Sequence, residues 1–178
     1  YKTTAALVIT KSGVEIVGDG ATSSAIVNTT SGVNIFEIGN GSTQITEVKI
    51  RHLNIQGGDN SDWAVYARKS PNLTISDCSI SNSSTAEGAI YLSESWNSRI
   101  ENTTIGSIKG TGIYTINSTN SLAITGVRID GTGAAGVGNG VYITGNNTVF
   151  TGCTIQGIGK LGDLIGRGIS FNTCYFES

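Results

Sequence analysis

The sequence has little charge and few of the residues that mark enzymes or membrane proteins. Only 13% of the 178 residues are charged, and the chain has one Pro, one His and no Met. A formal net charge of −2 at pH 7 argues against a nucleic-acid-binding surface, which needs a basic stripe. No apolar run approaches the ~18 residues of a membrane-spanning helix. We therefore expect neither nucleic acid nor membrane as a partner.

The residues that remain point to a folded β-rich domain. Ile and Val recur regularly among Ser, Thr and Asn, and 38% of the residues are hydrophobic, which excludes a highly charged disordered chain. The 25 Gly show no three-residue period, which excludes collagen. Because no initiator Met or signal peptide is present, we expect a processed product or a piece of a longer chain.

Three apolar patterns repeat with the same period of about 25 residues. One is an apolar-x-Ile triplet that ends at Ile55, Ile80, Ile105, Ile129 and Ile155. A second comprises Ile50, Ile75, Ile100, Ile124 and Phe150. A third is an aliphatic residue followed by Tyr, at Val65-Tyr66, Ile90-Tyr91, Ile113-Tyr114 and Val141-Tyr142. Each segment is short, β-branched and alternating, as strands are.

Three short strands in each repeat predict a solenoid, because one coil cannot bury its apolar face without its neighbours. Like residues then stack at about 4.8 Å from coil to coil. Asn72, Asn97 and Asn147 precede the second pattern and favour left-handed corners. We expect one all-β domain over 1–178, with irregular first coils over 1–44, regular coils over 45–178, and little or no helix.

The repeats and the opening segment resemble the right-handed parallel β-helix superfamily, which includes pectate lyases, polygalacturonases and phage tailspikes. The opening segment, Ser12-Gly13-Val14-Glu15-Ile16-Val17-Gly18-Asp19-Gly20 followed by Ala25-Ile26-Val27, is similar to the first coils of tailspike-type β-helices. The resemblance implies a single-stranded helix of about six to seven coils. Lyases of this superfamily use Ca²⁺ with a basic residue, and its hydrolases use grouped Asp side chains. No such motif occurs here, so whether the chain is an enzyme stays open, with non-catalysis favoured.

The only acidic candidates for catalysis are Asp77 and Glu101. Both are expected on one solvent face of adjacent coils, near Arg51 and Arg99. Paired carboxylates can transfer protons or hold Ca²⁺, but scattered surface ion pairs explain them as well. His52, in the same register as Asp77, is expected to support a turn. No Cys/His cluster predicts a metal site, so we expect no cofactor, with Ca²⁺ as the alternative.

The most suggestive surface feature is an outward aromatic stripe. Tyr66, Tyr91, Tyr114 and Tyr142 should point outward when the residues before them point inward. Trp63 and Trp96 are expected nearby, in turns. Such a stripe could stack on sugar rings or pack against another subunit. Stacked Tyr side chains that simply shield a flat sheet are the alternative.

The sequence leaves open whether two of the three cysteines form a disulfide. Cys78 and Cys153 share an inward position three coils apart, roughly 14 Å, which is too far for a disulfide. Cys153 and Cys174 fall on neighbouring coils, where either a bond or a stack of small buried thiols would fit.

Asn-x-Ser/Thr acceptor sequences for N-glycosylation are plentiful. They begin at Asn28, Asn40, Asn72, Asn82, Asn102, Asn117 and Asn146. They favour a glycoprotein outside the cell or on a cell or virion surface, although Asn-rich corners account for some of them.

Neither end of the sequence reads as a capping segment, so we expect open β edges, which recruit further strands. Two complementary open ends would generate a filament. The leading hypothesis is therefore a non-catalytic extracellular structural or adhesive solenoid that associates with itself. The alternative is a module that binds or degrades polysaccharide, as tailspikes and pectate lyases do.

Overall fold

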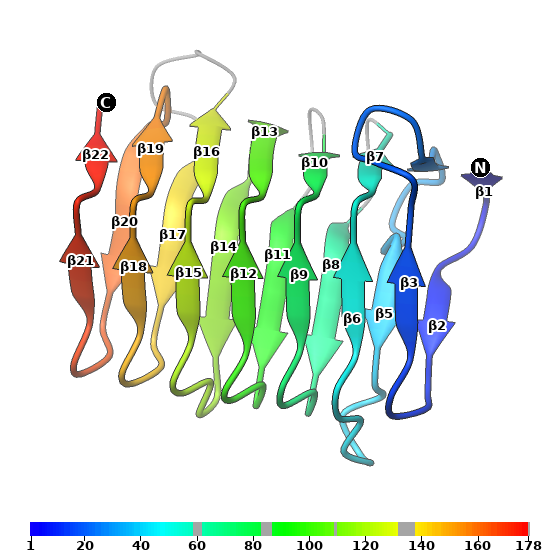
Figure 1. Ribbon diagram of the computed structural model, residues 1–178, viewed down its shortest axis with the longest axis horizontal. Helices are drawn as coiled ribbons and strands as arrows, with labels where there is room; N and C mark the ends of the chain where they lie inside the picture. The colour runs from blue at the N-terminus through cyan, green and yellow to red at the C-terminus, as the bar shows by residue number, and fades with distance from the viewer. Residues whose placement is uncertain (59–61, 83–86, 109, 132–137, 178) are drawn as a thin grey trace.

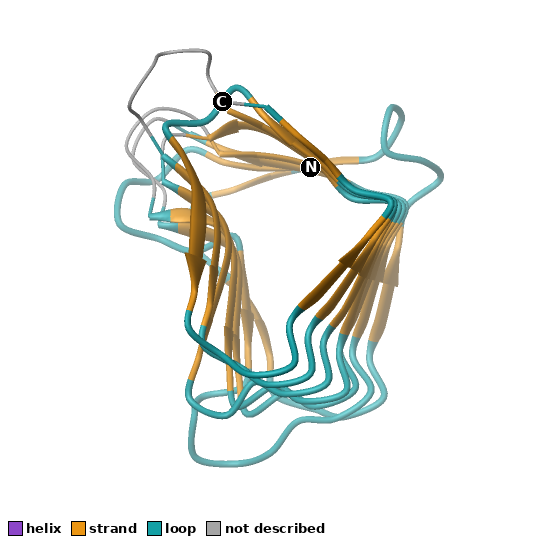
Figure 2. Cartoon of the chain, turned by 90° about the vertical axis from the view of Figure 1, so that its left-hand side faces the viewer, coloured by secondary structure: helices purple, strands orange, loops and turns teal. Residues whose placement is uncertain are grey.

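The chain folds into a stack of parallel coils. The structure, a computed structural model, describes residues 1–58, 62–82, 87–108, 110–131 and 138–177. Over these residues it contains 22 strands and no helix. Figure 1 shows the coils side by side from the N-terminus to the C-terminus, and Figure 2 looks along the stack at three sheets around a triangular cross-section. This confirms the right-handed parallel β-helix with three short strands per coil.

Each coil contributes one strand to each of three parallel sheets. The first sheet contains β1 (Lys2–Thr3), β4 (Ala25–Asn28), β7 (Asn54–Gly57), β10 (Ser79–Asn82), β13 (Thr104–Ile108), β16 (Arg128–Gly131), β19 (Thr154–Gln156) and β22 (Tyr175–Phe176). The second contains β2 (Leu7–Ile9), β5 (Phe36–Ile38), β8 (Trp63–Arg68), β11 (Gly88–Ser93), β14 (Thr111–Ile116), β17 (Asn139–Ile143) and β20 (Lys160–Leu164). The third contains β3 (Glu15–Val17), β6 (Lys49–Arg51), β9 (Thr74–Ser76), β12 (Arg99–Glu101), β15 (Ala123–Thr125), β18 (Val149–Thr151) and β21 (Ser170–Asn172).

The repeated apolar residues form the core, in register from coil to coil. Ile80 pairs with Ile55 on one side and Ile105 on the other. Ile100 likewise lies between Ile75 and Ile124 in the third sheet. These side chains are at most 1% exposed. The sequence period therefore places like residues directly above one another, and their burial is what holds one coil against the next.

Two columns of left-handed residues turn the chain at the ends of the third sheet. The column before it comprises Glu47, Asn72, Asn97, Ser121, Asn147 and Gly168, with φ between 55° and 66°. The column after it comprises His52, Asp77, Asn102, Gly126, Gly152 and Thr173, with φ between 47° and 62°. The amides at these corners donate to carbonyls of the next coil, as from Asn72 to Trp96. The corners therefore continue the inter-strand ladder, and Asn is frequent because it tolerates this backbone.

The three cysteines are free thiols. Cys78 and Cys153 point into the core and are 2% exposed, whereas Cys174 is partly exposed at the last coil. Burial raises the pKa of both inward thiols. The alternative of stacked thiols therefore describes this structure, and Cys153 and Cys174 are neighbours without a bond.

Candidate functional site

Four tyrosines form a continuous row on the outer face of the second sheet. Tyr66, Tyr91, Tyr114 and Tyr142 pair in register along β8, β11, β14 and β17. Their ring centroids are 4.5, 5.6 and 4.5 Å apart in that order, and adjacent planes differ by 22°, 9° and 10°. We call this set the tyrosine row.

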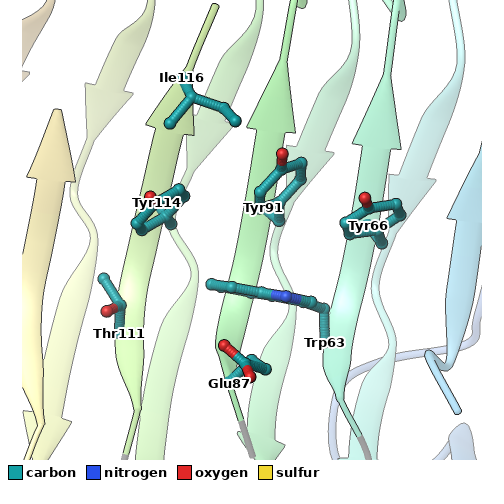
Figure 3. Close-up of a pocket in the computed structure, with 7 residues that line it drawn as sticks. All are labelled: Trp63, Tyr66, Glu87, Tyr91, Thr111, Tyr114 and Ile116. Atoms are coloured by element: carbon teal, nitrogen blue, oxygen red, sulfur yellow. The ribbon is translucent and has the colours of Figure 1, made fainter. Parts of the chain in front are cut away.

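The rings of the tyrosine row overlap without covering one another completely. Carbon atoms in contact lie about 3.5–4.0 Å apart, so near-parallel rings with centroids at 4.5–5.6 Å are offset. All four side chains are half-buried. Each ring is therefore only partly covered by its neighbours, and the hydroxyls of Tyr66 and Tyr91 point the same way in Figure 3.

Trp63 adds a flat wall beside the row. It is the first residue of β8, and its indole lies 5.3 Å from the Tyr91 ring and 5.7 Å from the Tyr114 ring, tilted by 57° and 50°. Gly88 stands next to it in register on β11. A Cβ on Gly88 would lie 2.5 Å from indole Cζ3, so only glycine leaves space for the ring there.

The row and the indole enclose an open hollow of about 320 Å³. Besides Trp63 and three tyrosines of the row, its lining comprises Glu87, Thr111 and Ile116. In the view of Figure 3, the indole lies between the Tyr91 ring and the carboxylate of Glu87. Glu87 is exposed and has no ion-pair partner within the part of the chain that the structure describes.

Charged residues continue the column beyond both ends of the tyrosine row. Glu37 pairs in register with Tyr66, and Asp163 pairs with Tyr142. Glu37 accepts a hydrogen bond from the amide of Asn34 at 2.9 Å, and Asp163 pairs with Lys160. The guanidinium carbon of Arg68 lies 5.1 Å from the centroid of the Tyr66 ring, a cation–π contact.

The surroundings keep the central phenols protonated. Burial raises the pKa of Tyr91, and the neighbouring Tyr66 adds to the shift, while a hydrogen bond with Ser93 opposes it. Burial also raises the pKa of Tyr114, with further contributions from Tyr142 and from the negative charge of Glu87. Neutral phenols can both donate and accept hydrogen bonds.

One of the sequence expectations about tryptophan placement is wrong. Trp63 lies in a strand, not in a turn. Trp96 does lie in a turn, between β11 and β12, but it is absent from the lining of the hollow. The carbonyl of Trp96 accepts a hydrogen bond from the backbone amide of Asn72. The backbone of Trp96 therefore stabilises a corner of the coil and not the tyrosine row.

The acidic candidates Asp77 and Glu101 lie next to each other on adjacent coils, at the end of the third sheet. Asp77 occupies a left-handed corner and accepts a hydrogen bond from the amide of Asn102 at 3.3 Å. Glu101 ends β12, and its carbonyl accepts the backbone amide of Asp77. Arg51 pairs with Glu15 instead. His52 occupies the same corner column as Asp77, where its left-handed backbone turns the chain. Nowhere in the described ranges do three or more His, Cys, Asp or Glu side chains gather as a metal site would require.

The glycosylation candidates differ in accessibility. The exposed ones are Asn40, Asn72, Asn102, Asn117 and Asn146, where modification stays a prediction. The side chain of Asn82 lies outside the described residues. Asn28 does not fit, because its side chain is fully buried and its amide faces the carbonyls of Ala5 and Asn34 at 3.5 Å. A glycan there would require this part of the core to open.

Sequence reasoning missed three residues of the hollow, Glu87, Thr111 and Ile116. The signal for Thr111 was its register. It aligns with Trp63, Gly88 and Asn139 in one outward column, in which glycine stands beside the largest side chain. Glu87 immediately precedes that column, and no repeat marks it.

Proteins of known structure share this fold. A pectin methylesterase, PemA from Erwinia chrysanthemi, superposes with a TM-score of 0.54 at 12% identity, covering 99% of this chain and 78% of its own. A pectin methylesterase mutant in complex with a hexasaccharide superposes with a TM-score of 0.51 at 12% identity, covering 92% and 70%. No curated protein sequence gives a significant match. At this identity the two structures share the fold alone.

The described residues contain no helix long and apolar enough to cross a membrane. The family model for right-handed β-helix regions matches residues 9–176, which is nearly the whole chain. The chain therefore belongs to the right-handed β-helix family.

Proposed function

We propose that this β-helix binds an extended polysaccharide along the tyrosine row. The observation that carries the proposal is the row itself: four half-exposed phenols, one per coil, beside an open hollow walled by Trp63. Aromatic side chains offer sugars an apolar surface for C–H groups and a polar tip for hydroxyls. A pyranose chain advances by a distance similar to the coil spacing of about 4.8 Å, so successive sugars would meet successive tyrosines.

Two further facts support a carbohydrate ligand. The chain belongs to the right-handed β-helix family, and a protein with the same fold has been solved in complex with a hexasaccharide. The fold alone does not assign function, so the proposal depends on the row and its hollow. We propose binding without cleavage, because Glu87 is the one carboxylate among the described residues that line the hollow.

The test is a binding assay on soluble neutral, acidic and amino-bearing polysaccharides by affinity electrophoresis and calorimetry. We expect at least one class to bind and Tyr91→Ala to weaken that binding roughly tenfold, the order expected for one aromatic contact. Tyr175→Ala is the matched control, because Tyr175 is exposed on the first sheet, away from the tyrosine row. If no class binds, or if both variants lose binding equally while still folded, the proposal fails.

Self-association of the solenoid, end to end or side by side, stays a prediction from the sequence. Light scattering over a range of concentrations tests it independently of ligand binding.

A further inference from the structure

The hollow beside the tyrosine row points to a particular class of sugar. Building on the proposed function, we propose that it receives a protonated amino group, so that the ligand is a glycan of amino sugars, such as a glucosamine polymer, and not a polyuronate. This assignment differs from what the pectin-modifying proteins of the same fold suggest.

Glu87 supplies a negative charge at the hollow. Its carboxylate lines the hollow together with Trp63, Tyr91 and Tyr114 (Figure 3). It is exposed and has no ion-pair partner among the residues that the structure describes. Its negative charge also contributes to the raised pKa of Tyr114. An ammonium group entering the hollow would meet a carboxylate and aromatic rings together, which is how proteins bind ligand cations.

The tyrosine row already holds one cation. The Arg68 guanidinium lies 5.1 Å from the Tyr66 centroid, at one end of the row. The faces of Tyr91 and Tyr114 are partly covered by the rings stacked on them, whereas the tilted indole of Trp63, 5.3 and 5.7 Å from these two rings, adds a further electron-rich face beside the row. Tryptophan is the best of the aromatic partners for a cation.

Carboxylates are distributed along the whole row. Glu37 pairs with Tyr66 from the coil before it, and Asp163 pairs with Tyr142 from the coil after it. Glu87 lies between these two ends of the row, at the hollow. Of the described basic groups at this face, Lys160 is paired with Asp163 and Arg68 lies over Tyr66. A polyuronate carries one negative charge per sugar and would be repelled by Glu37 and Glu87, which have no ion-pair partner among the described residues, whereas an amino-sugar polymer would be attracted to them.

Three oligosaccharides of equal length separate the possibilities: oligomers of glucosamine, of N-acetylglucosamine and of galacturonic acid. They are titrated calorimetrically at low salt and mildly acidic pH, where the amino groups of glucosamine carry a proton and carboxyl groups in general are still ionised. The first two share a backbone and differ in the charge of the amino group. We expect the glucosamine oligomer to bind roughly tenfold more tightly than its acetylated counterpart, as one charge-assisted cation–π contact would give. The galacturonate oligomer should bind most weakly.

Glu87→Gln should remove the preference for the free amine without abolishing binding of the acetylated oligomer. Glu47→Gln is the matched control, because Glu47 is an exposed carboxylate at a corner before the third sheet and does not line the hollow. It should leave the preference intact.

Equal binding of the acetylated and free oligomers, or tightest binding of the galacturonate oligomer, would overturn the inference while leaving the proposed function standing. Tighter binding of an oligolysine of the same length would also overturn it, because that result would assign the hollow to a peptide. If none of the oligosaccharides binds, the proposed function fails and this inference fails with it.

Discussion

The indole of Trp63 lies over Gly88 of the next coil, with its Cζ3 atom 2.5 Å from the point where a Cβ would stand. The same point is 2.1 Å from the carbonyl oxygen of Thr111, on the coil after that. A glycine on β11 therefore lets a tryptophan from β8 reach the rings of Tyr91 and Tyr114. One small residue thus determines the shape of the hollow.

Gly88→Ala should displace the indole and reduce polysaccharide binding. Because the new methyl group also meets backbone, we expect a loss of about 1–3 kcal/mol in the free energy of unfolding. Calorimetry and denaturant unfolding measure the two effects.

Gly106→Ala is the control for that substitution. No atom lies within 4 Å of a Cβ at Gly106, so both binding and stability should be unchanged to within about 0.5 kcal/mol. Equal behaviour of the two variants would show that the close approach at Gly88 does not shape the site.

The core prediction concerns Ile105, which is fully buried between Ile80 and Ile129. Ile105→Ala should lower the free energy of unfolding by about 2–5 kcal/mol, because it leaves a cavity in a closely packed stack. The neighbouring Thr104 is exposed, and Thr104→Ala should change stability by no more than about 0.5 kcal/mol. Urea unfolding of both variants checks the contrast, and equal losses would contradict the stacked core.

How far the sequence predicts this molecule depends on whether a feature repeats. Ile55, Ile80 and Ile105 recur with a period of about 25 residues, so their stacking follows from that period alone. The tyrosine row is predictable for the same reason. Because each coil repeats the pattern of its neighbour, an assignment made in one coil supports the same assignment in the next.

Features that occur only once could not be predicted from the repeat. Trp63 and Trp96 are the same residue type, but only Trp63 stands beside a glycine in an outward column, which admits its ring to the row. Glu87 joins the hollow through tertiary placement alone. Asn28 has an acceptor sequence, yet its amide is fully buried where β4 ends. These outcomes depend on neighbours in space, which the period does not specify.

The cysteines should differ in reactivity towards a water-soluble alkylating agent at mildly alkaline pH. Cys174 is partly exposed and should be modified first. Cys78 and Cys153 should react only slowly, because both are buried and burial raises the pKa of their thiols, which reduces the reactive thiolate. Peptide mapping of timed samples identifies the order. Early modification of Cys78, or an isolated Cys153–Cys174 disulfide, would contradict the structure.

Stability should decline at strongly alkaline pH in a way that depends on the tyrosine row. Burial raises the pKa of Tyr91 and of Tyr114 in the folded chain, whereas an unfolded chain ionises its tyrosines near pH 10. The stability that neutral phenols contribute is therefore complete below about pH 10 and is lost as the pH rises through the folded-state values.

Unfolding free energies measured from pH 8 to pH 12, together with the ultraviolet absorbance of tyrosinate, test this dependence. The decline should be smaller in a Tyr91→Phe, Tyr114→Phe double variant, which lacks both ionisable groups. An identical decline in the double variant would show that groups other than these two tyrosines cause the alkaline loss of stability.

The fluorescence of Trp63 reports most directly on whether the tyrosine row and its hollow bind carbohydrate. The chain has two tryptophans, so Trp96→Phe leaves Trp63 as the only tryptophan, and Trp63→Phe leaves Trp96. Titration of the Trp96→Phe variant with the tightest-binding oligosaccharide should give a saturable change in tryptophan emission, and titration of the Trp63→Phe variant should give none. Unchanged Trp63 emission, while calorimetry shows that the oligosaccharide is bound, would place the binding site away from the hollow and contradict the account.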